Sequence, residues 1–206
     1  MIVYDLEIVK AVPDRKKPNL PGIKYCTGWD DHAGMGISVL CAYDTKDHRF
    51  RVFCDDNKEA FLELISKDES LPLVSFNGLA FDNRVISACW GISIDPNRCY
   101  DLLVETWRAH GLAPKFQYPT HIGYGLDAII KANKLAEGKT GEGAHAPVAW
   151  QQGKIGEVID YCLEDVRLTH ILYSASLGGS PLVSPVTGKE FRLDAWSPDP
   201  DGDIPF

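Results

Sequence analysis

The chain has 206 residues, of which 45% are hydrophobic and 24% are charged, and this composition suits one globular domain, or one domain with a short appendage. It excludes wholesale disorder and fibrous architectures, and no apolar run reaches the length of a membrane span. The net charge of −8 is unusual for a generic nucleic-acid binder, but divalent ions held by some of the acids would offset it, so nucleic acid is not excluded.

Apolar runs and helical spacing divide the first half of the chain into short elements. The polar turn at residues 44–48 lies between two such runs and predicts an antiparallel hairpin. Asp55 or Asp56 is expected to be the N-cap of the first helix, and Gly91 is expected to end the second. In chain order we expect a strand over 2–8, strands over 37–43 and 50–53, a helix over 57–65, a strand over 71–76 and a helix over 81–90.

The second half of the chain alternates loops rich in glycine or proline with helical patterns. In chain order we expect a strand over 100–104, an aromatic and basic loop over 106–125, a helix over 126–135, a Gly-rich loop over 137–147, a helix over 155–177 and a hairpin of residues 182–186 and 190–193. This order predicts an α/β fold with a mixed β-sheet over residues 1–178, followed by a C-terminal hairpin and acidic tail over residues 179–206.

The N-terminus and the cysteines indicate where the protein is located. The first ten residues, MIVYDLEIVK, carry carboxylates where a signal peptide needs an uninterrupted apolar stretch. The six cysteines form no CxxC pair and no zinc-ligand spacing, which favours reduced thiols over a disulfide framework. We therefore expect a cytoplasmic protein that does not associate with membranes.

Two acids interrupt the apolar pattern of the first strand. Asp5 and Glu7 are two residues apart, so their side chains project from the same face of that strand. Two neighbouring carboxylates on an otherwise apolar strand are costly unless a cation lies between them. A divalent metal ion would serve, and a salt bridge to arginine or lysine is the alternative.

Two later segments carry polar groups at equally informative places. Asn77, Phe81 and Asp82 span a strand end, a tight turn and the first turn of a helix, where an acid can also simply favour the helix dipole. Tyr161 and Asp165 are four residues apart in the longest predicted helix, so they share a face that should point inward. A phenol and a carboxylate on a buried face need polar partners.

Taken in order, Asp5-x-Glu7, Asn77-x-x-x-Phe81-Asp82 and Tyr161-x-x-x-Asp165 resemble the DEDD family of 3′→5′ exonucleases of the RNase H-like superfamily. The tyrosine four residues before the last aspartate resembles the DEDDy branch, and the segments look most like the exonuclease domain of family B DNA polymerases. The resemblance implies an RNase H-like mixed β-sheet flanked by helices and hydrolysis of phosphodiesters with two divalent ions, Mg²⁺ or Mn²⁺.

The resemblance also implies a role for each residue of the motif. Four carboxylates would hold the metal ions, and the tyrosine would orient the attacking water rather than act as a strong base. Asp5 would bridge both ions, Glu7 and Asp165 would hold the ion that activates water, and Asp82 would hold the second ion. Tyr161 would form a hydrogen bond to the water. Asn77 and Phe81 would shape the pocket for the terminal nucleotide.

Two basic segments are candidates for contact with the substrate. Aromatic rings and positive charges alternate at Trp107, Arg108, Lys115 and Phe116, which is how proteins hold single strands without sequence preference. The alternative is a proline-rich loop packed on its own aromatic rings. A second basic rim, for which a solvated loop is the alternative, consists of Lys10, Arg15, Lys16, Lys17 and Lys24.

The last residues form an acidic tip with one aromatic anchor. Their sequence, Asp201-Gly202-Asp203-Ile204-Pro205-Phe206, resembles the C-terminal tip of bacterial single-stranded-DNA-binding proteins, which docks partner proteins. The resemblance implies that Asp201, Asp203, Ile204, Pro205 and Phe206 bind such partners. A solubilising tail and a tail that inhibits the basic entrance are the alternatives.

These observations together predict a metal-dependent 3′→5′ exonuclease that hydrolyses single-stranded DNA to nucleoside monophosphates, in DNA replication or repair. An exoribonuclease with the same chemistry is one alternative, since a metal site cannot distinguish the sugars. A module that recruits partners through its tip is the other.

Overall fold

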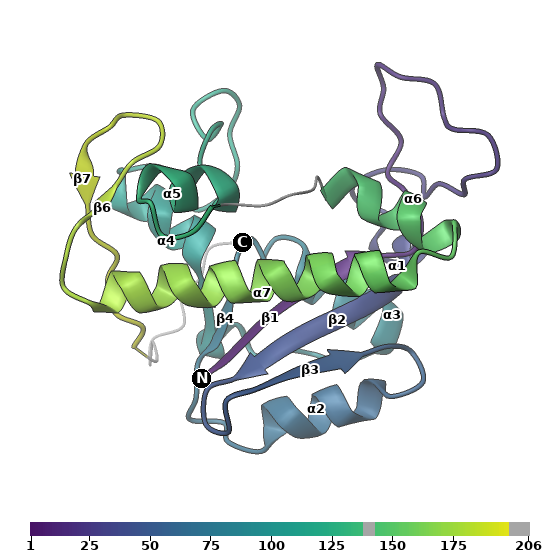
Figure 1. Cartoon of the computed structure of the whole chain (residues 1–206), viewed down its shortest axis with the longest axis horizontal. Coiled ribbons are helices and arrows are strands. Elements are labelled where there is room, and N and C mark those ends of the chain that lie inside the picture. Colours follow the sequence, from purple (N-terminus) through teal and green to yellow (C-terminus); the bar gives the residue numbers. More distant parts are fainter. Residues whose placement is uncertain (138–142, 198–206) are drawn as a thin grey trace.

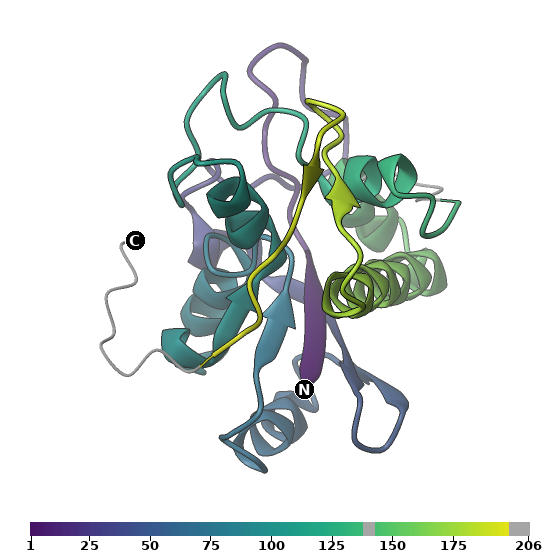
Figure 2. The same ribbon diagram turned by 90° about the vertical axis from the view of Figure 1, so that its left-hand side faces the viewer.

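A five-stranded mixed β-sheet with helices on both faces forms the centre of the molecule, as the sequence predicts (Figures 1 and 2). The computed structural model describes residues 1–137 and 143–197. The strand order is β3-β2-β1-β4-β5, in which β2 pairs antiparallel with β1 and β3, and β4 pairs parallel with β1 and β5. The strands are β1 (Ile2–Ile8), β2 (Ile37–Asp44), β3 (Arg49–Phe53), β4 (Leu73–Ser75) and β5 (Cys99–Asp101).

Strand β1 runs through the middle of the sheet and serves both of its faces. Tyr4 and Leu6 are buried in the core on one face, whereas Val3 is buried in the core on the other. Successive side chains of a strand point to opposite faces, so Asp5 and Glu7 point to the same face as Val3. The strand is apolar on both sides because both sides are covered, and the two acids are the exceptions.

Different helices cover the two faces. Helices α2 (Lys58–Ser66) and α3 (Asp82–Trp90) pack on the face of Tyr4 and Leu6. On the other face, α7 (Ile155–Leu177) crosses β1 and β2, and α5 (Leu126–Ala132) packs against α7 (Figure 1). The remaining helical elements of the described residues are α1 (His32–Met35), α4 (Leu102–Ala109), α6 (Ala146–Gln151) and the 3₁₀ turns η1 (Pro96–Arg98) and η2 (Gly143–His145).

Several predicted elements are confirmed, because each is marked by local periodicity or a local stop signal. The longest helix spans the predicted residues 155–177, and α3 ends at Gly91, whose φ of 69° is left-handed. The antiparallel hairpin of β2 and β3 is also present.

Other predictions are wrong at places where side chains bond to the backbone. The predicted strand over 100–104 ends at Asp101, because its carboxylate accepts hydrogen bonds from the N–H groups of Leu103 and Val104. Helix α4 therefore begins inside the predicted strand and continues into the segment predicted to be loop. The N-cap of α2 is Asn57 rather than Asp55 or Asp56. Helix α6 likewise lies partly within the predicted Gly-rich loop.

The C-terminal hairpin packs onto the rest of the chain. It consists of β6 (Leu182–Val183) and β7 (Glu190–Phe191), and its apolar residues enter the core beside α5 and α7. The side chain of Asn133 accepts a hydrogen bond from the Val183 N–H at 2.6 Å and donates one to its carbonyl at 2.9 Å. The division of the chain at residue 178 stays a prediction. The acidic tip, with residues 201–206, lies outside the described residues.

Two expectations about the class of protein can be compared with the structure. Within the described ranges, none of the helices combines the length and the apolar character needed to cross a bilayer. All six cysteines are free thiols, as predicted. The cytoplasmic location stays a prediction.

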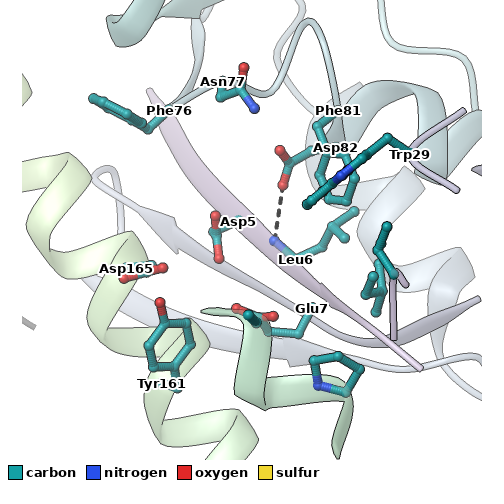
Figure 3. A pocket seen from close by; sticks show the side chains of 14 residues that line it. Asp5, Leu6, Glu7, Trp29, Phe76, Asn77, Phe81, Asp82, Tyr161 and Asp165 are labelled. Atoms are coloured by element: carbon teal, nitrogen blue, oxygen red, sulfur yellow. Dashed lines mark hydrogen bonds between the residues drawn. The ribbon is translucent and has the colours of Figure 1, made fainter. Parts of the chain in front are cut away.

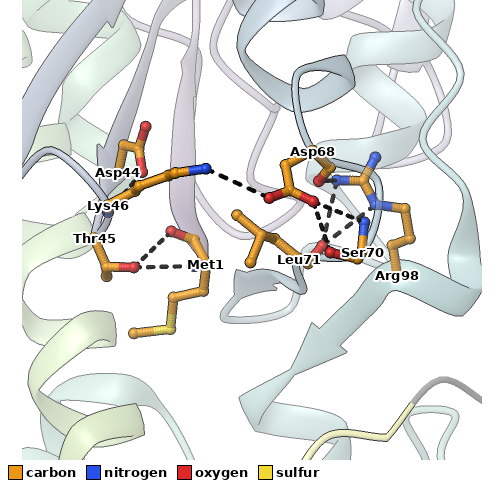
Figure 4. A network of polar contacts seen from close by, with 8 residues as sticks. All are labelled: Met1, Asp44, Thr45, Lys46, Asp68, Ser70, Leu71 and Arg98. Carbon is orange, nitrogen blue, oxygen red and sulfur yellow. Dashed lines mark hydrogen bonds and ion pairs between the residues drawn. The ribbon is translucent and has the colours of Figure 1, made fainter.

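A guanidinium group fixes the edge of the sheet that carries β4 and β5 (Figure 4). Arg98 donates hydrogen bonds to the carbonyl groups of Ile65 at 2.8 Å, Asp68 at 3.1 Å and Leu71 at 3.3 Å. These carbonyls lie at the end of α2 and in the turn that leads to β4. The single side chain therefore ties the helix, the turn and the start of β5 together.

We predict that Arg98→Ala lowers the free energy of unfolding by about 2–3 kcal/mol, because hydrogen bonds from a charged donor to three carbonyls are lost. Urea denaturation measures this change. Arg49→Ala, which removes an exposed arginine of β3, is the control and should change the free energy by less than about 0.5 kcal/mol. Equal losses in the two variants would contradict the role of Arg98.

Candidate active site

A pocket of about 390 Å³ opens where β1, α3, α6 and α7 meet. Side chains from segments far apart in the sequence line it, and they include the five residues of the predicted motif (Figure 3). The acids and the phenol in its wall are Asp5, Glu7, Asp82, Tyr161 and Asp165. The structure therefore brings together the residues that the sequence pattern singled out.

Three of these carboxylates form a tight cluster. One carboxylate oxygen each from Asp5, Glu7 and Asp165 lies within 4.8 Å of the others. Glu7 and Asp165 are buried and Asp5 is half-buried. Like charges this close repel strongly in a partly dry site, so the cluster favours a bound cation. Carboxylate oxygens are the ligands that Mg²⁺ and Mn²⁺ prefer, and this donor set fits a divalent ion.

Asp82 lies in the same pocket but outside this cluster. It stands in the first turn of α3, and its carboxylate accepts a hydrogen bond from the N–H of Leu6 at 3.1 Å (Figure 3). Burial, together with the nearby charges of Asp101 and Asp165, raises the pKa of Asp82 to about 7. A cation at the pocket would reverse this effect and favour the ionised carboxylate.

A buried carboxylate holds the turn that leads to Asp82. Asp101 accepts hydrogen bonds from the N–H groups of Asn77 at 2.8 Å and Leu79 at 3.0 Å. Asn77 has a φ of 71°, which asparagine tolerates better than most residues. Gly78 follows because a Cβ there would lie 2.2 Å from the Ser75 hydroxyl oxygen. Asp101 thus fixes the turn and, at the same time, the start of α4.

Tyr161 and Asp165 project from adjacent turns of α7 toward β1, and Figure 3 shows the phenol hydroxyl beside the Asp165 carboxylate. Between them, Cys162 is buried against β1, with its sulfur 3.4 Å from the carbonyl oxygen of Asp5. The next polar residue of the helix, Glu164, pairs instead with Arg167 at 2.5 Å. The inward face predicted for Tyr161 and Asp165 is therefore confirmed.

The predicted substrate residues divide into two groups. Asn77 and Phe81 line the pocket. Trp107, Arg108, Lys115 and Phe116 do not: Trp107 is only 4% exposed and packs against His121, and Arg108 pairs with Glu105 at 2.6 Å. The indole of Trp107 has no open face for a base, so the alternative of a loop packed on its own rings holds there. Lys115 and Phe116 are exposed on that loop.

Sequence reasoning missed Trp29. It lines the pocket, is 68% exposed, and meets Phe81 edge to face with ring centroids 6.1 Å apart. It lies in an irregular segment before α1, where no periodicity marks it. The available signal was an aromatic residue between Gly28 and two aspartates, shortly after the second basic rim in the sequence.

Helix α6 closes one side of the pocket and was also missed. Pro147, in its first turn, and Ala144, just before it, contribute to the wall. The Gln151 amide nitrogen donates to the carbonyls of Val9 at 2.9 Å and Lys24 at 3.0 Å, and its oxygen accepts from the Lys24 N–H at 2.7 Å. Gln151 therefore fastens α6 to the end of β1 and to Lys24 of the second basic rim.

Comparisons with known proteins agree with this architecture. The model of the RNase_H superfamily matches residues 26–176, a range that includes Asp82, Tyr161 and Asp165 and begins after Asp5 and Glu7. Among solved structures, the fold is similar to a family B DNA polymerase from the hyperthermophilic archaeon Pyrobaculum calidifontis, with a TM-score of 0.55 and 16% identity. The similarity covers 85% of this chain and 24% of the polymerase chain. No curated protein sequence matches.

We predict that Asp101→Ala lowers the free energy of unfolding by at least about 3 kcal/mol, because several buried N–H groups lose their acceptor. Asp101→Asn keeps one acceptor oxygen and should lose less. Urea denaturation measures both variants. The control is Asp95→Ala, since Asp95 accepts a hydrogen bond from the Asn97 N–H at an exposed site and its loss should cost about 1 kcal/mol. If Asp101→Ala cost no more than Asp95→Ala, the anchoring role would be refuted.

Proposed function

The chain belongs to the RNase_H superfamily, and from this premise we propose that it is a metal-dependent 3′→5′ exonuclease acting on single-stranded DNA. Membership of the superfamily supports nuclease activity in general, whereas the likeness to the polymerase concerns the fold alone. The observation that carries the proposal is the convergence of Asp5, Glu7 and Asp165, with Asp82 and Tyr161 in the same pocket. The 3′→5′ direction rests on the resemblance of these residues to the DEDDy motif.

The four carboxylates are the proposed metal-binding residues. Asp5, Glu7 and Asp165 would hold one divalent ion, and Asp82, on the opposite side of the pocket, would complete the site for a second. When bound, two such ions supply a hydroxide nucleophile at neutral pH and offset the charge that develops at phosphorus. The side chains contribute rigid positions, since β1 and α7 are regular elements and the Leu6 N–H holds Asp82.

Tyr161 is proposed to orient the attacking water. Tyr161 lines the pocket with its hydroxyl beside the Asp165 carboxylate, and from there it could donate to or accept from a water molecule (Figure 3). A phenol has a pKa near 10, so at neutral pH it acts by hydrogen bonding rather than as a general base. Its position one helical turn from Asp165 fixes the direction of that hydrogen bond.

The size of the pocket supports attack at a chain end. A volume of about 390 Å³ is at the lower end of the range for small-ligand sites and suits one nucleotide. Phe81 and Phe76 provide apolar wall and Asn77 a polar group, which can contact a base and a sugar. Each turnover would then release one nucleoside monophosphate.

Two further proposals go with this function. The exposed Lys115 and Phe116 would contact the strand beyond the pocket, where stacking and phosphate contacts need no sequence preference. The tip residues 201–206 would dock partners of a single-stranded-DNA-binding protein, through one aromatic anchor among acids.

We predict that the chain degrades 5′-labelled single-stranded DNA progressively from the 3′ end with Mg²⁺ or Mn²⁺, and not with a chelator. Asp5→Ala should reduce the rate by at least about 10³-fold through loss of a metal ligand, and Tyr161→Phe by about 10²-fold through loss of one positioning hydrogen bond. Gel analysis of the products measures both rates.

The matched control is Asp160→Ala, because Asp160 precedes Tyr161 in α7 but is exposed. It should leave the rate unchanged. Undiminished degradation by Asp5→Ala, or activity in the presence of chelator, would refute the proposal. Faster decay of an RNA strand of the same sequence would overturn the preference for DNA.

A further inference from the structure

Trp29 separates two hollows on the surface. One is the pocket of the carboxylates, and the other is a neighbouring hollow of about 680 Å³ that Arg15 and Thr27 also line. Tryptophan is highly buried on average in folded proteins, yet Trp29 exposes 68% of its surface. Trp29 therefore borders both hollows and is largely exposed.

The segment around Trp29 is fixed by several hydrogen bonds. The Cys26 N–H donates to the Ala11 carbonyl at 3.0 Å, and the Asp31 carboxylate accepts from the N–H groups of Thr27 at 2.8 Å and Gly34 at 3.0 Å. The indole also packs against the Phe81 ring, with an angle of 66° between the two ring planes (Figure 3). An exposed ring that is held in this way is preorganised for a flat ligand.

The charges of the second hollow indicate how a strand would lie in it. Asp31 is already engaged by backbone N–H groups, whereas Arg15 and Asp30 are exposed at its rim. A phosphate would be repelled by Asp30 and attracted by Arg15, so its place is on the side of Arg15. An exposed ring beside a cation is the usual way in which proteins grip a single strand.

We propose that Trp29 and Arg15 form a second nucleotide subsite, a role that rests on the proposed exonuclease function. The terminal nucleotide lies in the pocket of the carboxylates. Trp29 stacks on the base of the nucleotide next to it, which stays on the strand after cleavage, and Arg15 contacts the following phosphate. The enzyme thus grips two nucleotides, one for the chemistry and one for position.

A strand that lacks only the second base from its 3′ end tests this subsite. For the wild-type protein, KM for this abasic strand should rise by about tenfold or more over the intact strand, because one stacked base is lost. Trp29→Ala should raise KM for the intact strand by a similar factor and should remove the penalty for the abasic strand. Trp29→Phe should restore most of the penalty, since a smaller ring can still stack.

The control is Phe50→Ala, which removes an aromatic ring of β3 that is 46% exposed and should leave both KM values unchanged. If the abasic penalty persisted undiminished in Trp29→Ala, the subsite would be refuted. Asp5→Ala tests the chemistry separately. If Asp5→Ala lost its activity while Trp29→Ala kept the abasic penalty, only the subsite would be refuted. Full activity of Asp5→Ala would refute the exonuclease proposal itself.

Arg15→Gln provides a second readout that does not depend on stacking. Binding of the intact strand to the inactive Asp5→Ala protein should become less sensitive to salt when Arg15 is replaced, because one phosphate contact is lost. An unchanged salt slope would remove Arg15 from the subsite.

Discussion

Electrostatic repulsion among three carboxylates is the constraint on which the centre of this molecule depends. Asp5, Glu7 and Asp165 lie within 4.8 Å of one another at the junction of the sheet and α7. A fold that holds three carboxylates this close together, two of them buried, does so at a cost in stability, and a divalent cation would turn that cost into binding energy. The position of the acids in the fold is therefore best understood through what they can bind.

The surrounding structure holds these acids in place from three directions. The middle strand of the sheet presents Asp5 and Glu7 on one face, and the long helix presents Tyr161 and Asp165 opposite them. The third direction comes from the turn before α3, because this turn leads to Asp82. Asp101 ties the turn to the start of α4. The scaffold is rigid where the proposed chemistry needs fixed oxygens.

Residues whose positions follow local rules could be predicted from the sequence. The strand period of two places Asp5 beside Glu7, and the helical spacing of four places Tyr161 beside Asp165. Asp101 could not be recognised, because its partners at Asn77 and Leu79 lie more than twenty residues earlier and meet it only in the folded chain. Long-range packing also buries Trp107 and leaves Trp29 exposed. Local composition does not report this packing, so the sequence indicated Trp107 as a substrate residue and missed Trp29.

The central claim is that the acidic pocket binds divalent ions, and crystals grown with Mn²⁺ test it most directly. Anomalous scattering should show a strong peak among the oxygens of Asp5, Glu7 and Asp165, with a second peak toward Asp82 once a strand is bound. Crystals of the Asp5→Ala protein grown under the same conditions should lack the first peak. A pocket without anomalous density at millimolar Mn²⁺, or a lysine or arginine side chain filling the space between the three carboxylates, would contradict the account.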